Sequence, residues 1–176
     1  AGEIATDLIR PVNLVWYWLA EDVGRSLAAV TQFALPVLAI ALAFVAPPLP
    51  ADALALALFL PSCALSFLVL WLLSALVGMT AFWVVDFGDV GTVKNSLVLA
   101  LSGRLVPMWL FPDALAQVSR WLPFQYTFQA PLEIYIGRTP ATEALSVLSV
   151  QAVWVVLFTL LVGLVWTRAQ RRVFVQ

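Results

Sequence analysis

Residues 53–85 form a run of 33 consecutive residues without a charged side chain, and a second uncharged run covers residues 26–51. An α-helix needs about 20 mostly apolar residues to cross roughly 30 Å of hydrocarbon, so each run is long enough to span a bilayer. Neither run has the polar face, recurring every 3.6 residues, that a surface helix of a soluble protein requires. The two runs therefore predict a membrane protein with several spans.

The composition of the whole chain agrees with this prediction. Mean hydropathy is +1.00, 63% of the residues are hydrophobic and only 11% are charged, against about 25% charged in typical soluble domains. No basic patch for nucleic acid is present. The single cysteine, Cys63, excludes a disulfide within the chain and lies in an apolar run.

The sequence lacks the residues of the common catalytic sites. It contains no histidine, which excludes Ser-His-Asp and Cys-His catalysis and HExxH zinc sites. It also contains no G-x-x-x-x-G-K-[ST] motif to hold ATP phosphates and no G-x-S-x-G motif. We therefore expect no catalytic residue, bound cofactor or metal ligand in this chain, and any ATP-driven work must use a separate subunit.

The pattern of charges and prolines predicts an all-α, polytopic bundle in the membrane. Residues 1–25 are predicted to be a cytoplasmic segment with an interfacial helix, because Trp16, Tyr17 and Trp18 are side chains that settle at the headgroups. A transmembrane domain follows over residues 26–172, and residues 173–176 form a tail. Its predicted spans are residues 26–46, 53–80, 95–111 and 144–166.

Two of these spans contain helix-breaking residues. Pro36 is expected to kink the first span. The second uncharged run is longer than the hydrocarbon requires, so its helix either tilts and protrudes or breaks near Gly78. Within it, Ser62/Ser66 and Ser74/Gly78 have the small-residue spacing that favours close helix packing.

The stretch from residue 112 to residue 140 differs from the spans. Leu115, Val118 and Leu122 recur at helical spacing, which predicts a short amphipathic helix. The following aromatic sequence, PFQYTFQAPLEIYIG, is interrupted by Pro123 and Pro131. It is too short to span, so we predict that residues 112–140 are interfacial or re-entrant.

Positive charges predict the orientation. With a cytoplasmic N-terminus, four spans place six cations inside and two outside, which agrees with the positive-inside rule. The inside cations are Arg10, Arg25, Lys94, Arg168, Arg171 and Arg172, and the outside cations are Arg120 and Arg138. Both ends of the chain are then cytoplasmic, and residues 112–140 are extracytoplasmic.

The order of several short motifs resembles the permeases of ABC type-2 transporters, in particular a bacterial subgroup of uncharacterised transport permeases. These motifs are GEIATDLIRP, SGRLVPMWLFP, PFQY and AP-x-EIYIG before the last span. The resemblance covers essentially the whole chain. It implies six spans per subunit, a cytoplasmic coupling element and short helices dipping into the outer leaflet. This chain then corresponds to the coupling element and spans three to six, and the first two spans are expected upstream of Ala1.

The resemblance also implies partners. It places a cytosolic ATPase against the coupling element, which here contains Glu3, Asp7, Arg10 and Pro11. The alternative interpretation of this element is an ordinary solvated segment. Asp86 and Asp89 are a further candidate contact for the ATPase, although a solvated turn is the simpler interpretation.

Arg104 is the clearest charged residue within a predicted span. A guanidinium in the membrane is costly and normally faces a bundle interior, a wet cavity or a carboxylate, so Arg104 is a candidate for the substrate path or a subunit interface. Asp113 or Glu133 is a possible partner if the outer segment folds back. Alternatively, the helix exits early and Arg104 reaches the outer headgroups.

Aromatic and amide side chains complete the candidate path. Phe124, Tyr126 and Phe128 are candidates for an outer gate or, alternatively, for membrane anchoring. Gln32, in the first span, is a candidate for a hydrogen bond across a subunit interface or within the bundle.

Together with the predicted membrane spans, the resemblance implies the permease subunit of an ATP-binding-cassette exporter, in the bacterial cytoplasmic membrane, and export rather than import is implied by the resemblance alone. Its expected partners are a cytosolic ATP-binding-cassette ATPase, which uses ATP, a second permease subunit forming a homo- or heterodimer, and the lipid bilayer. The alternative is a membrane scaffold or assembly subunit that does not transport. An ATPase with a P-loop in the neighbouring reading frame would favour the exporter.

Overall fold

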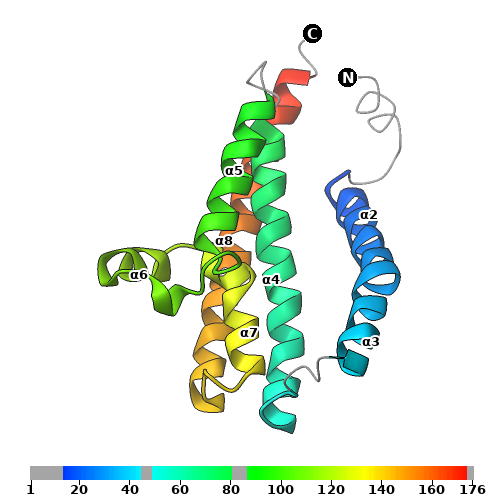
Figure 1. The fold of residues 1–176 in the computed structure, drawn as a ribbon. Helices are drawn as coiled ribbons and strands as arrows, with labels where there is room; N and C mark the ends of the chain where they lie inside the picture. Colours follow the sequence, from blue (N-terminus) through cyan, green and yellow to red (C-terminus); the bar gives the residue numbers. More distant parts are fainter. Residues whose placement is uncertain (1–13, 45–48, 81–86, 174–176) are drawn as a thin grey trace. The chain divides into compact units, whose positions relative to one another are not determined.

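A computed structural model describes residues 14–44, 49–80 and 87–173 (Figure 1). Within these ranges every regular element is helical. The chain divides into two compact units, residues 1–48 and residues 49–176. In the described part, three helices are long and apolar enough to cross a membrane, and a fourth apolar helix is shorter. The three are Trp16–Phe44, Ala53–Met79 and Ala141–Arg168, and the shorter one is Val90–Leu101.

The described part of the first unit is one uninterrupted helical rod. It consists of α2 (Leu14–Ala29), the π-helical turn η1 (Val30–Ala34) and α3 (Leu35–Phe44). The structure therefore differs from the prediction of a separate interfacial helix before the first span, because the helix continues without a break through residues 25 and 26. The aromatic residues near position 17 lie on the first turns of that same helix.

The predicted kink at Pro36 takes the form of the π turn. At η1 the N–H of Leu35 bonds to the carbonyl of Val30, five residues earlier instead of four. Proline has no N–H, and its ring crowds the carbonyl four residues before it. A wider turn directly before Pro36 relieves this crowding while the rod stays helical.

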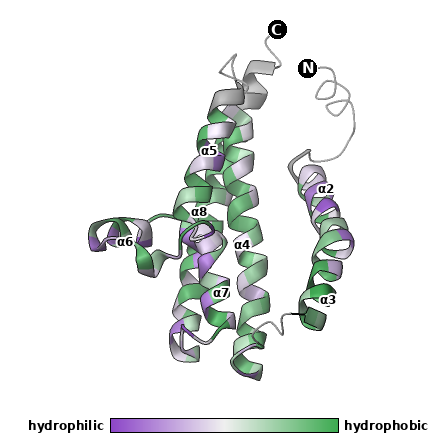
Figure 2. Cartoon of the chain, in the orientation of Figure 1, coloured by the Kyte–Doolittle hydropathy of each residue, from purple (hydrophilic) through white to green (hydrophobic). Residues whose placement is uncertain are grey.

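The surface of this rod changes from partly charged to apolar along its length. Charged residues lie on α2, where Arg25 pairs with Glu21 at 3.3 Å and with Asp22 at 3.1 Å. No residue of α3 is buried, and its exposed side chains are almost all apolar (Figure 2), with Phe44 84% exposed. An exposed helix without a polar face is typical of a segment surrounded by lipid or by other apolar helices.

Two long parallel helices form the framework of the second unit. Helices α4 (Ala53–Met79) and α8 (Ala141–Val173) lie side by side and start at the same end (Figure 1). The carboxylate of Asp52 caps α4 by accepting a hydrogen bond from the N–H of Ala55. The helix continues through Gly78 and ends at Met79, and residues 81–86 lie outside the described part.

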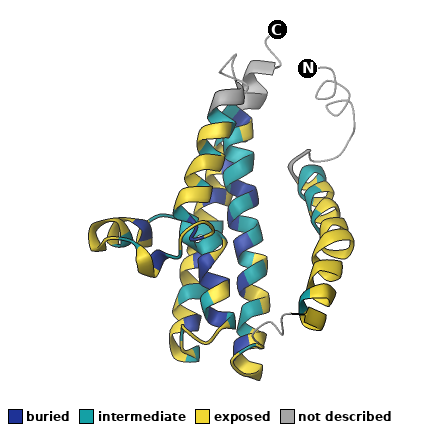
Figure 3. Ribbon diagram, viewed as in Figure 1, coloured by how far each residue is buried: buried dark blue, intermediate teal, exposed yellow. Residues whose placement is uncertain are grey.

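The core of this unit lies where α4 and α8 meet the shorter helices. Figure 3 shows the buried residues along the inner faces of these elements. The buried apolar side chains include Val69, Leu72 and Met79 of α4, Ala130 and Ile134 of α7 (Gln129–Tyr135), and Ala144, Phe158 and Val162 of α8. The outer faces of the long helices are largely exposed and apolar, as expected for a surface that lies against lipid.

A third column of the bundle consists of two separate helices. Helix α5 (Phe87–Leu101) and helix α7 (Gln129–Tyr135) follow one another end to end along α4 (Figure 1). The chain between them leaves the bundle sideways. This excursion contains η3 (Met108–Leu110), α6 (Asp113–Arg120) and η4 (Phe124–Thr127).

The third column corrects the predicted span over residues 95–111. Helix α5 begins at Phe87, before the predicted start at residue 95, so that residues 87–94 are helical. It also ends earlier, at Leu101, because Gly103 adopts a left-handed conformation with φ of 80°. Such a residue terminates an α-helix. The described part of the chain therefore has three long apolar helices and this shorter one where four spans were predicted.

Candidate functional site

The junction between α5 and α7 is a direct backbone contact. The N–H of Gln129, the first residue of α7, donates to the carbonyl of Ser102, just after α5, at 3.2 Å. The two helices together have a length of about 33 Å at 1.5 Å per residue, which is close to the thickness of the hydrocarbon. They thus form one discontinuous column, with a break about two thirds of the way from the start of α5.

The side chain of Gln129 stabilises the break. It is buried, with 4% of its surface exposed. Its Oε1 accepts a hydrogen bond from the N–H of Met108 at 3.0 Å, and its Nε2 donates to Oε1 of Glu133 at 2.8 Å. A Cβ atom at Gly103 would lie 1.9 Å from the Gln129 Oε1. Only glycine therefore fits at position 103, by backbone angle and by space.

Four residues form a second polar cluster, which we call the polar clasp: Ser62, Ser66, Tyr126 and Gln151. The hydroxyl of Ser62 donates to Gln151 Oε1 at 3.0 Å. The Nε2 of Gln151 donates to Ser66 Oγ at 2.9 Å and to the Tyr126 carbonyl at 3.0 Å. Ser66 also donates to the Tyr126 carbonyl, at 2.7 Å. The polar clasp thus joins α4, α8 and η4.

The polar clasp lies deep within the bundle. Ser66 is the middle residue of α4, and Ser62 and Gln151 are both fully buried. Inside a membrane no water replaces a lost hydrogen bond, so polar groups must find partners within the protein. The clasp also satisfies the carbonyl of Tyr126, which belongs to a short 3-10 helix at the depth of the break.

The end of α7 contacts residues near the start of α4. The ring of Tyr135 lies 5.1 Å from that of Phe59, and its carbonyl accepts from the N–H of Ala51 at 3.0 Å. Gly137 then ends the helix with φ of 72°, and the N–H of Arg138 donates to the Glu133 carbonyl at 2.9 Å. This pattern is a Schellman motif, which reverses the chain into α8.

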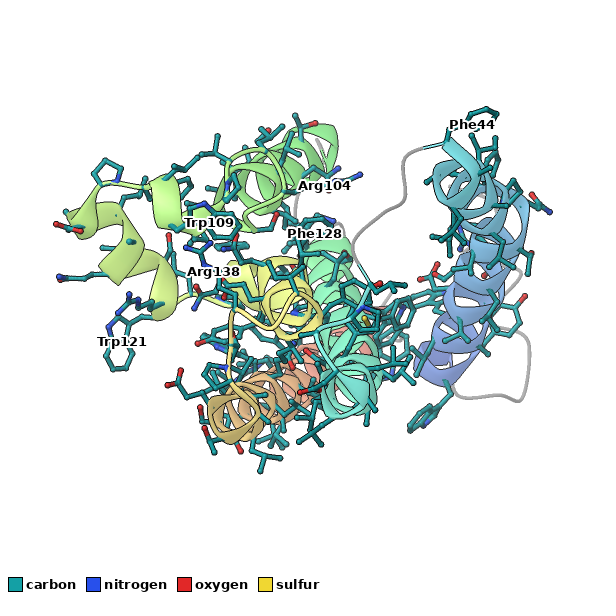
Figure 4. All side chains as sticks on the ribbon, turned by 60° about the horizontal axis from the view of Figure 1, so that its bottom comes forward. Phe44, Arg104, Trp109, Trp121, Phe128 and Arg138 are labelled. Atoms are coloured by element: carbon teal, nitrogen blue, oxygen red, sulfur yellow. The ribbon has the colours of Figure 1, made fainter. Side chains whose placement is uncertain are left out.

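Arg104 lies in the non-helical segment that follows α5, and not within a helix. Arg104 is exposed, and so are its neighbours Leu105 and Val106. It forms no ion pair with Asp113 or Glu133 in the structure, since Glu133 instead accepts from Gln129. Figure 4 shows the side chain of Arg104 at the edge of the bundle near the end of α5. Helix α5 therefore ends before Arg104, at Leu101.

The aromatic candidates lie around η4. Phe124 and Tyr126 are half-buried, and Phe128 is 41% exposed (Figure 4). Tyr126 contributes its carbonyl to the polar clasp, while its hydroxyl donates to the Arg120 carbonyl at 3.3 Å. Gln32 is separate from this group: it lies in η1 of the first unit and is exposed.

The predicted coupling residues Glu3, Asp7, Arg10 and Pro11 lie outside the described residues, and so does Asp86. Lys94, which was counted as a cytoplasmic cation, lies on α5 and donates from Nζ to Ser74 Oγ at 2.9 Å. Within the described ranges, no group of three or more His, Cys, Asp or Glu side chains is arranged to hold a metal ion.

Sequence reasoning named Ser62, Ser66 and Tyr126 of the clasp but missed three residues that hold the clasp and the break: Gln151, Gly103 and Gln129. Gln151 was detectable, because it is a lone amide within an apolar run, as Gln32 is. Gly103 stands beside Arg104 and before a proline-rich stretch, which marks a helix end. Gln129 has no such signal, since its role depends on contacts with residues more than twenty positions away.

Comparison with known protein families gives one match. A family model described as ABC-2 family transporter protein matches residues 1–174. No curated protein and no solved structure matches the chain.

Proposed function

We propose that this chain, which belongs to the ABC-2 family of transporter proteins, is the permease subunit of an ATP-binding-cassette exporter. The chain is a membrane component of such a transporter. A separate cytosolic ATPase supplies the energy. The match over residues 1–174 is the observation that carries this proposal. The three long apolar helices and the lack of a P-loop motif in the sequence are in keeping with it.

The proposed location is the bacterial cytoplasmic membrane, with both ends of this chain in the cytoplasm. The distribution of cations supports this orientation, because it places six cations on the cytoplasmic side and two on the outer side. Helices α4 and α8 then both run from outside to inside, and the column of α5 and α7 runs from inside to outside. The excursion over residues 102–128 leaves the column at the break, about 10 Å from its outer end at 1.5 Å per residue.

We propose that the break between α5 and α7 faces a second permease subunit or the path between subunits. Exposed, non-helical backbone within a membrane is tolerated where it contacts protein or lines a water-filled cavity. Residues 104–106 are both non-helical and exposed, and Ser102 lies beside Gln129 at the depth of the polar clasp. The exposed guanidinium of Arg104 also needs contact with protein or with a water-filled cavity, because lipid tails do not solvate a charge.

Substitution of Arg104 tests this assignment. We expect Arg104→Ala to lower transport by about tenfold, the order of effect of one lost charge-assisted contact, with normal expression. Arg138→Ala is the matched control, because it removes the same charge from an exposed residue whose guanidinium lies 4.1 Å from the ring centre of Trp109. Transport by reconstituted vesicles is the measurement. Unaltered transport by Arg104→Ala would leave only contact with the headgroups as its role.

We further propose that Glu3, Asp7, Arg10 and Pro11 contact the ATPase, and that Gln32 lies at an interface between subunits. A rigid cytoplasmic contact is needed to pass nucleotide-driven closure to the membrane helices, and charged groups set the register of such a contact. An exposed amide on an apolar helix, as at Gln32, gains a partner when helices associate in the membrane.

The double variant Asp7→Ala/Arg10→Ala tests the coupling contact. We expect weaker co-purification with the ATPase and a loss of most of the stimulation of ATP hydrolysis, because both charges act at one interface. Asp113→Ala/Arg138→Ala removes the same two charge types from the proposed opposite side and should leave both measurements unchanged. If the complex and its ATPase stimulation survive in the Asp7/Arg10 variant, the coupling assignment is wrong.

A further inference from the structure

A pocket of about 590 Å³ lies between α6, η4 and α8, outside the junction and beside the polar clasp, with which it shares Tyr126. It is lined by Gln117, Arg120, Trp121, Tyr126, Val150 and Trp154. The volume is within the range of small-molecule sites, roughly 300–1,000 Å³. The lining combines one cation and one amide with three aromatic rings, and it contains no acidic side chain.

The cation of the pocket forms no ion pair in the described part of the chain. Among the described residues the ion pairs are those of Arg25 with Glu21 and Asp22, and no described carboxylate lies within ion-pair distance of Arg120. The Arg120 carbonyl, by contrast, is engaged, accepting from Gln125 and from the Tyr126 hydroxyl. The backbone at Arg120 is thus fixed while its guanidinium remains available to a bound anion.

The pocket also lies where α8 changes from polar to apolar. Towards its start, α8 has Glu143, Ser146 and Ser149. Beyond Trp154 no charged residue occurs before Arg168. The face that begins with Val150 and Trp154 continues at helical spacing to Leu157 and Leu161, which are 42% and 38% exposed.

The exposed ring of Trp121 extends the apolar side of the pocket. Trp121 is 84% exposed and stands out from the end of α6 (Figure 4). Tryptophan is enriched where one end of a side chain contacts lipid and the other contacts headgroups. A ligand of this pocket therefore meets a charge and hydrogen-bond donors at one end and a continuous apolar strip at the other.

We propose that this pocket binds an anionic phospholipid of the surrounding bilayer. The phosphodiester lies at Arg120 and Gln117, because a guanidinium matches the geometry and charge of a phosphate. One acyl chain follows Trp154, Leu157 and Leu161 along α8. This inference depends on the membrane location of the chain and not on the transported substrate or on the direction of transport.

Native mass spectrometry of the full-length protein tests the proposal. The protein is purified in detergent with equal amounts of phosphatidylglycerol and phosphatidylcholine that have the same acyl chains. We expect wild type to retain phosphatidylglycerol preferentially. Arg120→Gln should lower the affinity for phosphatidylglycerol about fivefold, the effect of one cation near an anionic headgroup, and leave that for phosphatidylcholine unchanged.

Arg138→Gln is the matched control, because it removes the same charge from residues 112–140 but from a guanidinium that stacks on Trp109. It should retain wild-type preference. Equal retention of the two lipids by wild type, an unchanged preference in Arg120→Gln, or an equal loss in Arg138→Gln would each overturn the proposal.

A second measurement uses wild type alone and does not depend on the folding of a variant. Phosphatidylglycerol with brominated acyl chains should quench tryptophan fluorescence more than brominated phosphatidylcholine, since Trp121 and Trp154 are two of the eight tryptophans. Equal quenching by the two lipids contradicts a site selective for the anionic headgroup.

Discussion

Replacing Gln151 with leucine is expected to lower the free energy of unfolding by about 2–4 kcal/mol, because α8 loses its buried hydrogen bonds to α4 and to η4 at once. The amide of Gln151 bonds to Ser62, Ser66 and the Tyr126 carbonyl, and its side chain is fully buried. Leucine has a similar size, so the loss reports the hydrogen bonds rather than a cavity. Resistance to unfolding in mixed detergent micelles is the measurement.

Thr159→Val is the matched control for Gln151→Leu. Thr159 is on the same helix, is exposed, and bonds only to the Val155 carbonyl of its own helix at 2.7 Å. We expect a change of less than about 0.5 kcal/mol. If Gln151→Leu has an equally small effect, the clasp does not hold α8 to α4 and η4.

A double-mutant cycle then separates the clasp from the individual groups. Ser66→Ala and Gln151→Leu remove opposite sides of one hydrogen bond of 2.9 Å. The two losses should therefore not add, and the double variant should lie closer to Gln151→Leu alone. Simple additivity would mean that the two side chains act independently.

Replacing Gly103 with alanine is expected to cost about 3–5 kcal/mol and to disturb the junction of α5 and α7. The left-handed backbone, with φ of 80°, contributes about 1–2 kcal/mol for a residue with a Cβ. The new methyl group would also displace Gln129, whose Cβ and Oε1 lie within 2.9 Å of it, and break the bond to the N–H of Met108. The same detergent unfolding measurement applies.

Gly163→Ala provides the comparison for Gly103→Ala. Gly163 is within α8, and a Cβ there meets no atom within 4 Å. Alanine favours a helix over glycine by up to about 1 kcal/mol, so this variant should be as stable as wild type or slightly more so. Wild-type stability in Gly103→Ala would show that the junction tolerates a side chain and that the break is not fixed by residue 103.

Much of the fold follows from the distribution of apolar residues. The uncharged runs predicted the three long apolar helices, Trp16–Phe44, α4 and α8, because lipid requires that each spanning segment satisfy its own backbone. Proline and glycine marked the changes of direction, as at Pro36, where the kink takes the form of a π turn. The amphipathic spacing of Leu115 and Val118 predicted α6, which the structure has at Asp113–Arg120.

The third column shows the limit of such reasoning. Apolar residues continue past Leu101 to Phe111, so periodicity alone favours a helix over 95–111. The helix ends at Leu101 because Gly103 packs on Gln129, a residue that is distant in the sequence. Similarly, α7 is only seven residues long and gains its stability from contacts with α4. A helix of that length does not form by propensity alone.

The sequence by itself determined that this chain lies in a membrane, which segments are long enough to cross it, and which family it resembles. These properties depend on hydrophobicity and on motif order, both of which are local. Tertiary structure alone decided that α5 and α7 form one broken column, that Gln151 joins three elements, and that Arg104 follows the end of a helix. Each of these depends on hydrogen bonds between distant residues, because buried polar groups in a membrane find their partners only when the helices pack.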